Sequence, residues 1–250
     1  MHTPPLKKRI DLLLTEQGFA PSRSRARDMV SRGCVRVDNA AVLKAGATFL
    51  PSANIQVNDP SHGYVSRAAL KLIAGLDASG IDVTTKFCLD LGSSTGGFTE
   101  VLLERGAQHV LALDVGHGQM VEHIANDLRV TNLEKFNARD LTQKDLPQTP
   151  EVVVSDMSFI SLRIAAEPAL LLAADNACTV LLVKPQFEVG RDGIGKGGLV
   201  TDKALVEKTL DEIKAWFSNL SGWSITHFLA APLTGGDGNQ EYLLCGTRNV

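Results

Sequence analysis

Residues 89–107 read LDLGSSTGGFTEVLLERGA. An apolar strand ends at Asp90, Gly92 permits a tight turn, and Gly96 and Gly97 let a ligand approach the backbone where a helix begins. In open α/β sheets, nucleotide-like ligands bind at this place, outside the carboxyl ends of the strands. The stretch therefore predicts an α/β domain that binds a nucleotide-like cofactor.

Further apolar stretches continue this pattern along the chain, and helical stretches lie between most of them. Apolar strands that alternate with helices indicate a mostly parallel sheet covered on both faces. The last two stretches can form an antiparallel edge. The predicted strands are FCLDLG (87–92), HVLALDVG (109–116), EVVVSDMS (151–158), TVLLVKPQF (179–187), WSITHFLAAP (223–232) and EYLLCGT (241–247).

The acidic residues at the strand ends narrow the choice of cofactor. Dinucleotide enzymes share this plan, but the chain lacks GxGxxG, and an acid directly before the glycine turn is more typical of S-adenosylmethionine sites. Asp114 ends the next strand, where a carboxylate can bind two ribose hydroxyls. Asp140, in NARDL between the predicted strands 109–116 and 151–158, is expected near the adenine amino group. No GxxxxGK[ST] motif follows a strand, which excludes a P-loop. The predicted cofactor residues are Asp90, Gly92, Ser93, Ser94, Thr95, Gly96, Gly97, Phe98, Asp114 and Asp140.

Four further residues are candidates for catalysis. Asp156, in VVSDMSFIS, follows the fourth strand, and neither an Asn-Pro-Pro-aromatic motif nor a cysteine nucleophile stands there. Lys184 follows the apolar run VLLV (180–183) at the end of the fifth strand, which is no place for an ordinary surface charge. Lys71 lies in the helical stretch SRAALKL, and Glu241 opens the last strand after a glycine-rich turn. Residues 193–198 (GIGKGG) are interpreted as a mobile, slightly basic flap.

The first 60 residues predict a separate α+β unit. A helix is expected over 6–18, ending at Gly18, and a second begins after Ser22 or Ser24 and ends at Gly33. A hairpin with an Asp38-Asn39 turn follows, and a further strand closes a small sheet. Residues 61–63 are the predicted linker to a domain over 64–250. The predicted RNA-binding residues are Arg23, Arg25, Arg27, Arg32 and Arg67.

Composition supports this division and excludes other classes. Residues 1–60 carry nine Lys and Arg against five Asp and Glu, whereas the rest of the chain is acidic, so contact with phosphates is expected in the first unit. The four cysteines form no CxxC pair, and no metal-binding spacing occurs, so no metal is expected. No apolar stretch fits a signal peptide or the ~18 residues of a membrane span. A cytoplasmic protein without a membrane partner is expected.

Two resemblances sharpen these expectations. The run SRSRARDMVSRGCVRVDN (22–39), with the rest of its unit, resembles the alpha-L RNA-binding domain of the ribosomal-protein-S-four type. Nearly the whole chain resembles the TlyA family of ribosomal RNA 2′-O-methyltransferases, within the wider FtsJ or RrmJ type. The matching segments are VSRAALKL, DLGSSTGGFT, ALDVGHGQ, SDMSFISL, LVKPQFEVGR and GNQEYLL.

The resemblance implies a Rossmann-like methyltransferase sheet of about seven strands and a Lys-Asp-Lys-Glu tetrad at Lys71, Asp156, Lys184 and Glu241. It implies ribosomal RNA or ribosomal subunits as partner, and cytidine 2′-hydroxyls as targets. A lysine can take the hydroxyl proton only if its surroundings lower its pKa. We expect Lys184 to be the base, although the sequence leaves Lys71 open. The oligomeric state is not readable from these residues.

Two rival functions remain at this point. The TlyA family is also described as hemolysin-like, which would make the chain a membrane-active protein, but neither an apolar span nor a strongly amphipathic basic helix is present. The second rival is a non-catalytic RNA-binding or ribosome assembly factor that retains the methyltransferase fold. An intact tetrad argues against it, because a pure binder has no need of two buried lysines.

Overall fold

The computed structural model describes residues 6–61 and 63–249. The chain divides into two compact units, residues 1–62 and 63–250, and this division falls within the predicted linker. Each unit has its own hydrophobic core. None of the helices in the described residues is both long enough and apolar enough to cross a bilayer.

The first unit packs two helices, α1 (Ile10–Glu16) and α2 (Arg23–Ser31), against short antiparallel strands. Ser22 caps α2, because its hydroxyl accepts a hydrogen bond from the backbone N–H of Arg25. Asp38 and Asn39 both have positive φ, as a type I′ hairpin turn requires. The strands are β1 (Lys8–Arg9), β2 (Val35–Val37), β3 (Ala40–Ala41), β4 (Thr48–Phe49) and β5 (Ile55–Val57).

Two expectations for this unit were wrong in detail. The first helix begins at Ile10 instead of residue 6, because the backbone of Lys8–Arg9 pairs with β4 as a strand. The expected small sheet is in fact two sheets, since β4 pairs only with β1 while β3, β2 and β5 form a three-stranded sheet. The helices still bury the expected faces, with Ile10, Leu13, Met29 and Val30 in the core.

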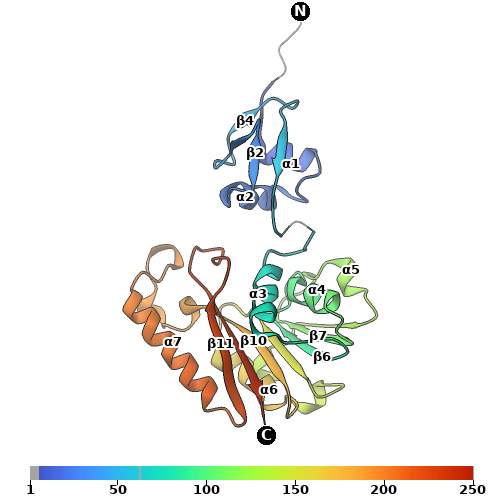
Figure 1. The fold of residues 1–250 in the computed structure, drawn as a ribbon, viewed down its shortest axis with the longest axis vertical. Helices are drawn as coiled ribbons and strands as arrows, with labels where there is room; N and C mark the ends of the chain where they lie inside the picture. The colour runs from blue at the N-terminus through green and yellow to red at the C-terminus, as the bar shows by residue number, and fades with distance from the viewer. Residues whose placement is uncertain (1–5, 62, 250) are drawn as a thin grey trace, which may run out of the picture. The chain divides into compact units, whose positions relative to one another are not determined.

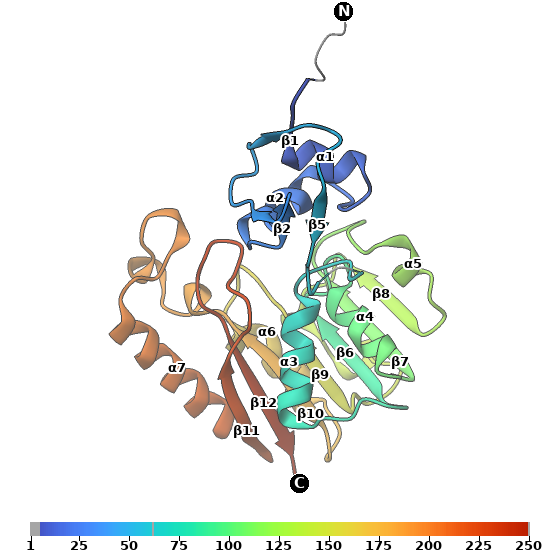
Figure 2. The ribbon, with the colours of Figure 1, turned by 45° about the horizontal axis from the view of Figure 1, so that its top comes forward.

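The second unit is a seven-stranded sheet with helices on both faces (Figures 1 and 2). Its strand order is β11-β12-β10-β9-β6-β7-β8. The strands are β6 (Phe87–Leu91), β7 (His109–Asp114), β8 (Val130–Glu134), β9 (Val152–Ser155), β10 (Cys178–Val183), β11 (Trp223–Ala230) and β12 (Tyr242–Arg248).

All neighbouring pairs are parallel except those made by β12, which is antiparallel to both β10 and β11. The reversed strand therefore lies inside the sheet, and β11 forms the edge. The last two strands thus form the expected antiparallel pair at the edge of the sheet. The expectation did not specify which strand of the pair lies inside the sheet. The insertion brings the start of β12, next to Glu241, beside the end of β10, next to Lys184.

Two helical layers cover the sheet. One core is formed with α3 (Ala69–Ser79), α4 (Gly97–Glu104) and α5 (Glu122–Ala125), and Figure 2 shows α3 and α4 crossing the same face. The opposite core is formed with α6 (Leu162–Leu171) and α7 (Lys203–Ser218). Single-turn 3₁₀ helices occupy the connections at Ala138–Asp140, Gln143–Asp145, Pro185–Phe187, Arg191–Gly193 and Lys196–Gly198.

Candidate active site

The glycine loop between β6 and α4 has no room for a side chain at Gly92 or Gly97. Gly92 has φ +80°, and a Cβ there would lie 2.9 Å from Met157 Sδ and 3.0 Å from the carbonyl oxygen of Asp156. A Cβ at Gly97 would lie 2.7 Å from Ser66 Cβ. The loop backbone therefore closely approaches both the segment after β9 and the segment before α3.

Asp90 lies beneath this loop with an unsatisfied oxygen. Its side chain is fully buried, and Thr99 Oγ1 donates a 2.7 Å hydrogen bond to Oδ2. Its Oδ1 accepts no hydrogen bond from the described part of the chain. Burial raises the pKa of this carboxyl to about 7, and the nearby charges of Asp156 and Asp114 also raise it. Three carboxylates thus gather around one glycine loop.

The other two predicted cofactor acids differ in their surroundings. Asp114, at the end of β7, accepts backbone hydrogen bonds from Ser94 (2.8 Å) and Gly116 (2.7 Å). Asp114 therefore fixes the glycine loop against the end of the neighbouring strand. Asp140 is exposed, with its Oδ1 3.6 Å from Nε of Arg139.

A cavity of about 150 Å³ opens over the glycine loop. The predicted residues Gly92, Ser93, Ser94, Thr95, Gly97 and Phe98 line it, together with Ser66, Ala68, Asp156, Ser158 and Lys184. Asp90, Gly96, Asp114 and Asp140 are not part of its lining. The cavity therefore connects the loop predicted for the cofactor with two of the residues predicted for catalysis.

The four predicted catalytic residues form two short ion pairs. Lys184 Nζ lies 2.6 Å from Asp156 Oδ1 and also donates a 2.9 Å hydrogen bond to Ser158 Oγ. Lys71 Nζ lies 2.5 Å from Glu241 Oε2. Both lysines and Glu241 are buried. Because α3, β9, β10 and β12 are adjacent elements, residues far apart in sequence meet at one end of the sheet.

A second cavity of about 400 Å³ shares Ser158 and Lys184 with the first. Glu241 also lines it, as do Gly197 and Gly198 of the predicted flap. The remaining lining residues are Phe159, Gln186, Phe187, Ile194, Gly236 and Asp237. Lys184 thus stands between a space lined by the glycine loop and a larger space lined by aromatic and polar side chains.

Sequence reasoning missed several residues of this second cavity. Phe159 is 92% exposed and has φ +64°, an unusual combination for a large apolar residue. Its ring centroid lies 5.2 Å from that of Phe187. Phe159 follows Asp156 in SDMSFIS and Phe187 follows Lys184 in KPQF. Their positions in the sequence, shortly after Asp156 and Lys184, could have indicated that both phenylalanines belong to the site.

The predicted RNA-binding arginines form two groups. Arg23 and Arg27, together with Arg9, surround the buried carboxylate of Asp11, and each donates a hydrogen bond of 3.0–3.1 Å to it. The guanidinium of Arg9, followed by those of Arg23 and Arg27, holds the pKa of Asp11 well below its usual range. All three arginines remain about half exposed.

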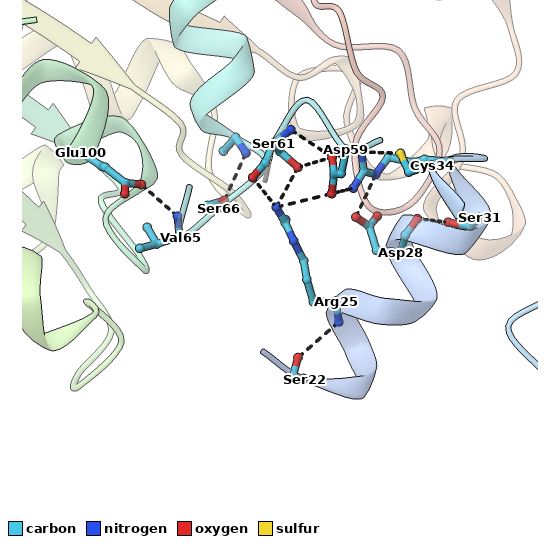
Figure 3. Close-up of polar contacts among 12 residues, drawn as sticks. Ser22, Arg25, Asp28, Ser31, Cys34, Asp59, Ser61, Val65, Ser66 and Glu100 are labelled. Carbon is cyan, nitrogen blue, oxygen red and sulfur yellow. Dashed lines mark hydrogen bonds and ion pairs between the residues drawn. The ribbon is translucent and has the colours of Figure 1, made fainter. Parts of the chain in front are cut away.

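Arg25 and Arg32 instead contact residues at the end of the first unit. Figure 3 shows Arg25 directed toward Ser61 and Asp59. Arg32 makes a bidentate pair with Asp59 at 2.7 and 2.8 Å, and Arg25 donates to Ser61 Oγ at 2.7 Å. Their side chains are only 15% and 17% exposed. These contacts fold the side chain of Arg25 back onto Ser61. Arg67 lies in the second unit, before α3.

Comparison with known proteins agrees with this geometry. The model of the FtsJ-like methyltransferase family matches residues 64–248, and the S4 domain model matches residues 8–55. A 16S/23S rRNA (cytidine-2′-O)-methyltransferase TlyA of Mycobacterium tuberculosis is 43% identical over 239 residues, which cover 95% of this chain and 89% of that protein. The chain belongs to the TlyA family of FtsJ-like methyltransferases.

Other TlyA-like relatives carry a different name. Hemolysin A of Brachyspira hyodysenteriae is 40% identical over 94% of this chain and 98% of its own length. A solved structure named as a hemolysin, from Streptococcus thermophilus, is 34% identical with a TM-score of 0.75 and covers 97% of this chain and 89% of that one. The TlyA fold therefore extends over both units of the chain.

Proposed function

We propose that this chain transfers a methyl group from S-adenosylmethionine to ribose 2′-hydroxyls of ribosomal RNA, with cytidine as the target nucleoside. The observation that carries the proposal is the position of Lys184. It pairs with Asp156, lines the cavity over the glycine loop and also lines the larger cavity beside it. A proton-accepting group between a donor site and an acceptor site is what methyl transfer to a hydroxyl requires.

The residues around the first cavity fit S-adenosylmethionine. The molecule carries a sulfonium and an ammonium group, and the carboxylate of Asp156 lines the cavity, whereas Asp90 and Asp114 lie outside its lining, next to the glycine loop. Asp90 Oδ1 is buried without a hydrogen-bond donor among the residues that the structure describes, so it is an acceptor close to the loop. Gly92 and Gly97 leave no room for side chains beside the loop. When bound, S-adenosylmethionine supplies a methyl group that is already activated by its sulfonium.

The protein must then align the hydroxyl and remove its proton. Lys184 Nζ donates a 2.9 Å hydrogen bond to Ser158 Oγ and lies 2.6 Å from Asp156 Oδ1, which makes no hydrogen bond among the residues that the structure describes. These two contacts hold Nζ at the boundary of the two cavities, where it can take the proton of a hydroxyl in the second cavity. We assign Lys184 as the base. The Lys71–Glu241 pair supports the adjoining wall of the second cavity.

The first unit supplies contact with RNA in this proposal. Arg9, Arg23 and Arg27 bring three guanidiniums around one buried carboxylate, which leaves a net positive, preorganised cluster. Such a cluster suits the phosphate backbone, whereas the exposed Phe159 and its neighbour Phe187 suit an unstacked base. A ribosomal substrate places the protein in the cytoplasm.

The decisive experiment measures transfer of labelled methyl from S-adenosylmethionine to unmethylated ribosomal subunits. Nuclease digestion then locates alkali-resistant ribose. The wild type is compared with Lys184→Ala and with the control Lys208→Ala, which removes an exposed lysine of α7. We expect label at a 2′-hydroxyl with the wild type and the control, and a loss of at least about 100-fold with Lys184→Ala. Cofactor binding without transfer to any subunit would instead support an RNA-binding assembly factor.

A further inference from the structure

Gln186 has a buried side chain with one half of its amide satisfied. The residue is 5% exposed, and its Nε2 donates a 3.1 Å hydrogen bond to Asp237 Oδ2. Its Oε1 is buried and accepts no hydrogen bond within residues 6–61 and 63–249. A buried acceptor without a donor costs free energy, so such atoms in a native structure call for an explanation.

The contact with Asp237 determines which end of the Gln186 amide lacks a hydrogen-bond partner among the described residues. A carboxylate only accepts hydrogen bonds, so the NH₂ group of Gln186 must face it and the carbonyl oxygen must face elsewhere. Asp237 is itself held, because its Oδ1 accepts the backbone N–H of Asn239 at 3.1 Å. The pair therefore presents an acceptor of defined orientation, and it requires a donor as its partner.

The cavity that Gln186 lines has the features of a nucleotide site. Lys184 and Glu241 line it, and so do Phe159 and Phe187, whose rings are tilted by 52°. Proteins read unstacked RNA bases by stacking on aromatic rings and by hydrogen bonds to the base edges. Gln186 lines the same cavity as an exposed aromatic ring, and its buried Oε1 is an acceptor of the kind that reads such an edge.

We propose that Gln186 selects the target base, with its Oε1 accepting a hydrogen bond from the exocyclic amino group of cytosine. Uracil carries an oxygen at that position, which would place two acceptors against each other and leave both unsatisfied. A site built around a hydrogen bond discriminates strongly against a ligand that cannot make it. The inference rests on the proposed methylation of RNA ribose and names the residue that sets its base preference.

The test uses two substrates, after the methylated nucleotide has been mapped on ribosomal subunits. One is the unmethylated subunit, and the other is the same subunit with the mapped cytidine replaced by uridine. Single-turnover transfer rates are measured at saturating S-adenosylmethionine. We expect the wild type to favour cytidine by at least about 10-fold, as the loss of one buried hydrogen bond implies. Gln186→Met, which has a similar shape but no acceptor at this position, should bring the ratio of the two rates close to 1.

Asp237→Asn provides a second variant with an opposite prediction. The new amide keeps an oxygen for the backbone N–H of Asn239, so its NH₂ group faces Gln186. Gln186 then turns its oxygen toward residue 237 and presents its NH₂ group to the base. We expect this variant to methylate the uridine substrate faster than the wild type does. A purely structural role for Asp237 predicts no such gain.

The outcomes separate this inference from the proposed function. Gln108→Met, at an exposed glutamine, serves as the control and should keep the wild-type ratio. If the mapping finds no methylated ribose on any subunit, the proposed function fails. If it favours cytidine while Gln186→Met slows both substrates equally, or Asp237→Asn leaves the ratio unchanged, base selection by Gln186 is overturned. If Gln186→Met does not fold, Asp237→Asn alone decides the question.

Discussion

Lys71 Nζ and Glu241 Oε2 lie 2.5 Å apart in the buried wall of the site, although 170 residues separate them in the chain. Lys71 is placed by α3, and Glu241 directly precedes β12. Both side chains are less than one-tenth exposed, so each charge depends on the other for compensation. The pair connects the helical layer to the reversed strand beside Lys184.

Removing one member of this pair should destabilise the protein more than removing both. Glu241→Gln leaves the ammonium of Lys71 buried without its counterion, and we expect a loss of about 3 kcal/mol in the free energy of unfolding. The double variant Lys71→Met with Glu241→Leu should recover most of that loss. Denaturant unfolding measures both effects. If the recovered double variant also regains full methyl transfer, the pair has a structural role alone.

Asp90→Asn should stabilise the ligand-free protein increasingly as pH rises. The buried carboxyl has its pKa raised to about 7, so between about pH 4 and 7 the folded state holds a proton that the unfolded state has lost. Stability therefore falls as pH rises through that range, and the neutral amide avoids the loss. We expect the advantage of Asp90→Asn to grow by about 2–3 kcal/mol between pH 5 and pH 8.

Unfolding of both proteins at pH 5, 6.5 and 8 tests this dependence. Asp175→Asn, at an exposed aspartate, is the matched control and should show no comparable trend. An advantage that stays constant with pH would contradict the raised pKa of Asp90. Above pH 7, where this carboxyl is ionised, the same substitution should weaken binding of S-adenosylmethionine, because it removes a negative charge beneath the glycine loop.

The sequence allowed much of this site to be predicted, because several of its residues follow strand ends. Asp114, Asp156 and Lys184 each end or directly follow a strand, Asp90 is the last residue but one of β6, and parallel strands bring their carboxyl ends to one edge. Lys71 and Glu241 were singled out in a helical stretch and before the last strand, and the family resemblance placed them in the tetrad. Their pairing depends on the insertion of β12 between β10 and β11, which no local pattern specifies.

Other features depend on contacts that a linear sequence does not display. The orientation of the Gln186 amide follows from Asp237, 51 residues later. The division of the arginines follows from Asp11 and Asp59, which lie outside the helix that carries them. In each case a carboxylate on another segment decides what a polar side chain can do.

Gly97→Ala should disturb the cofactor loop by a steric effect that a second substitution relieves. The added Cβ would lie 2.7 Å from Ser66 Cβ, so one segment must move. We expect a loss of about 1–3 kcal/mol in stability and weaker binding of S-adenosylmethionine. Ser66→Gly in the same chain should restore both, whereas Ser66→Ala retains the clashing Cβ and should not. Calorimetric titration of the cofactor distinguishes these results.

The two groups of arginines should respond differently to substitution by glutamine. Arg23 and Arg27 are about half exposed, so their guanidiniums can contact phosphate while they pair with Asp11. Each single variant should weaken RNA binding and lower the salt dependence, the slope of log K against log salt, by about 1. Arg32→Gln instead leaves Asp59 buried without its bidentate partner, so it should chiefly lower the stability of the first unit.

Binding of ribosomal RNA at several salt concentrations, together with thermal unfolding, separates these effects. Arg139→Gln is the control, since Arg139 is an exposed arginine of the second unit whose ion pair is with the equally exposed Asp140. An Arg32 variant that melts like the wild type but binds RNA with a reduced salt slope would place Arg32 on the RNA surface. Unchanged slopes for Arg23→Gln and Arg27→Gln would remove the cluster around Asp11 from that surface.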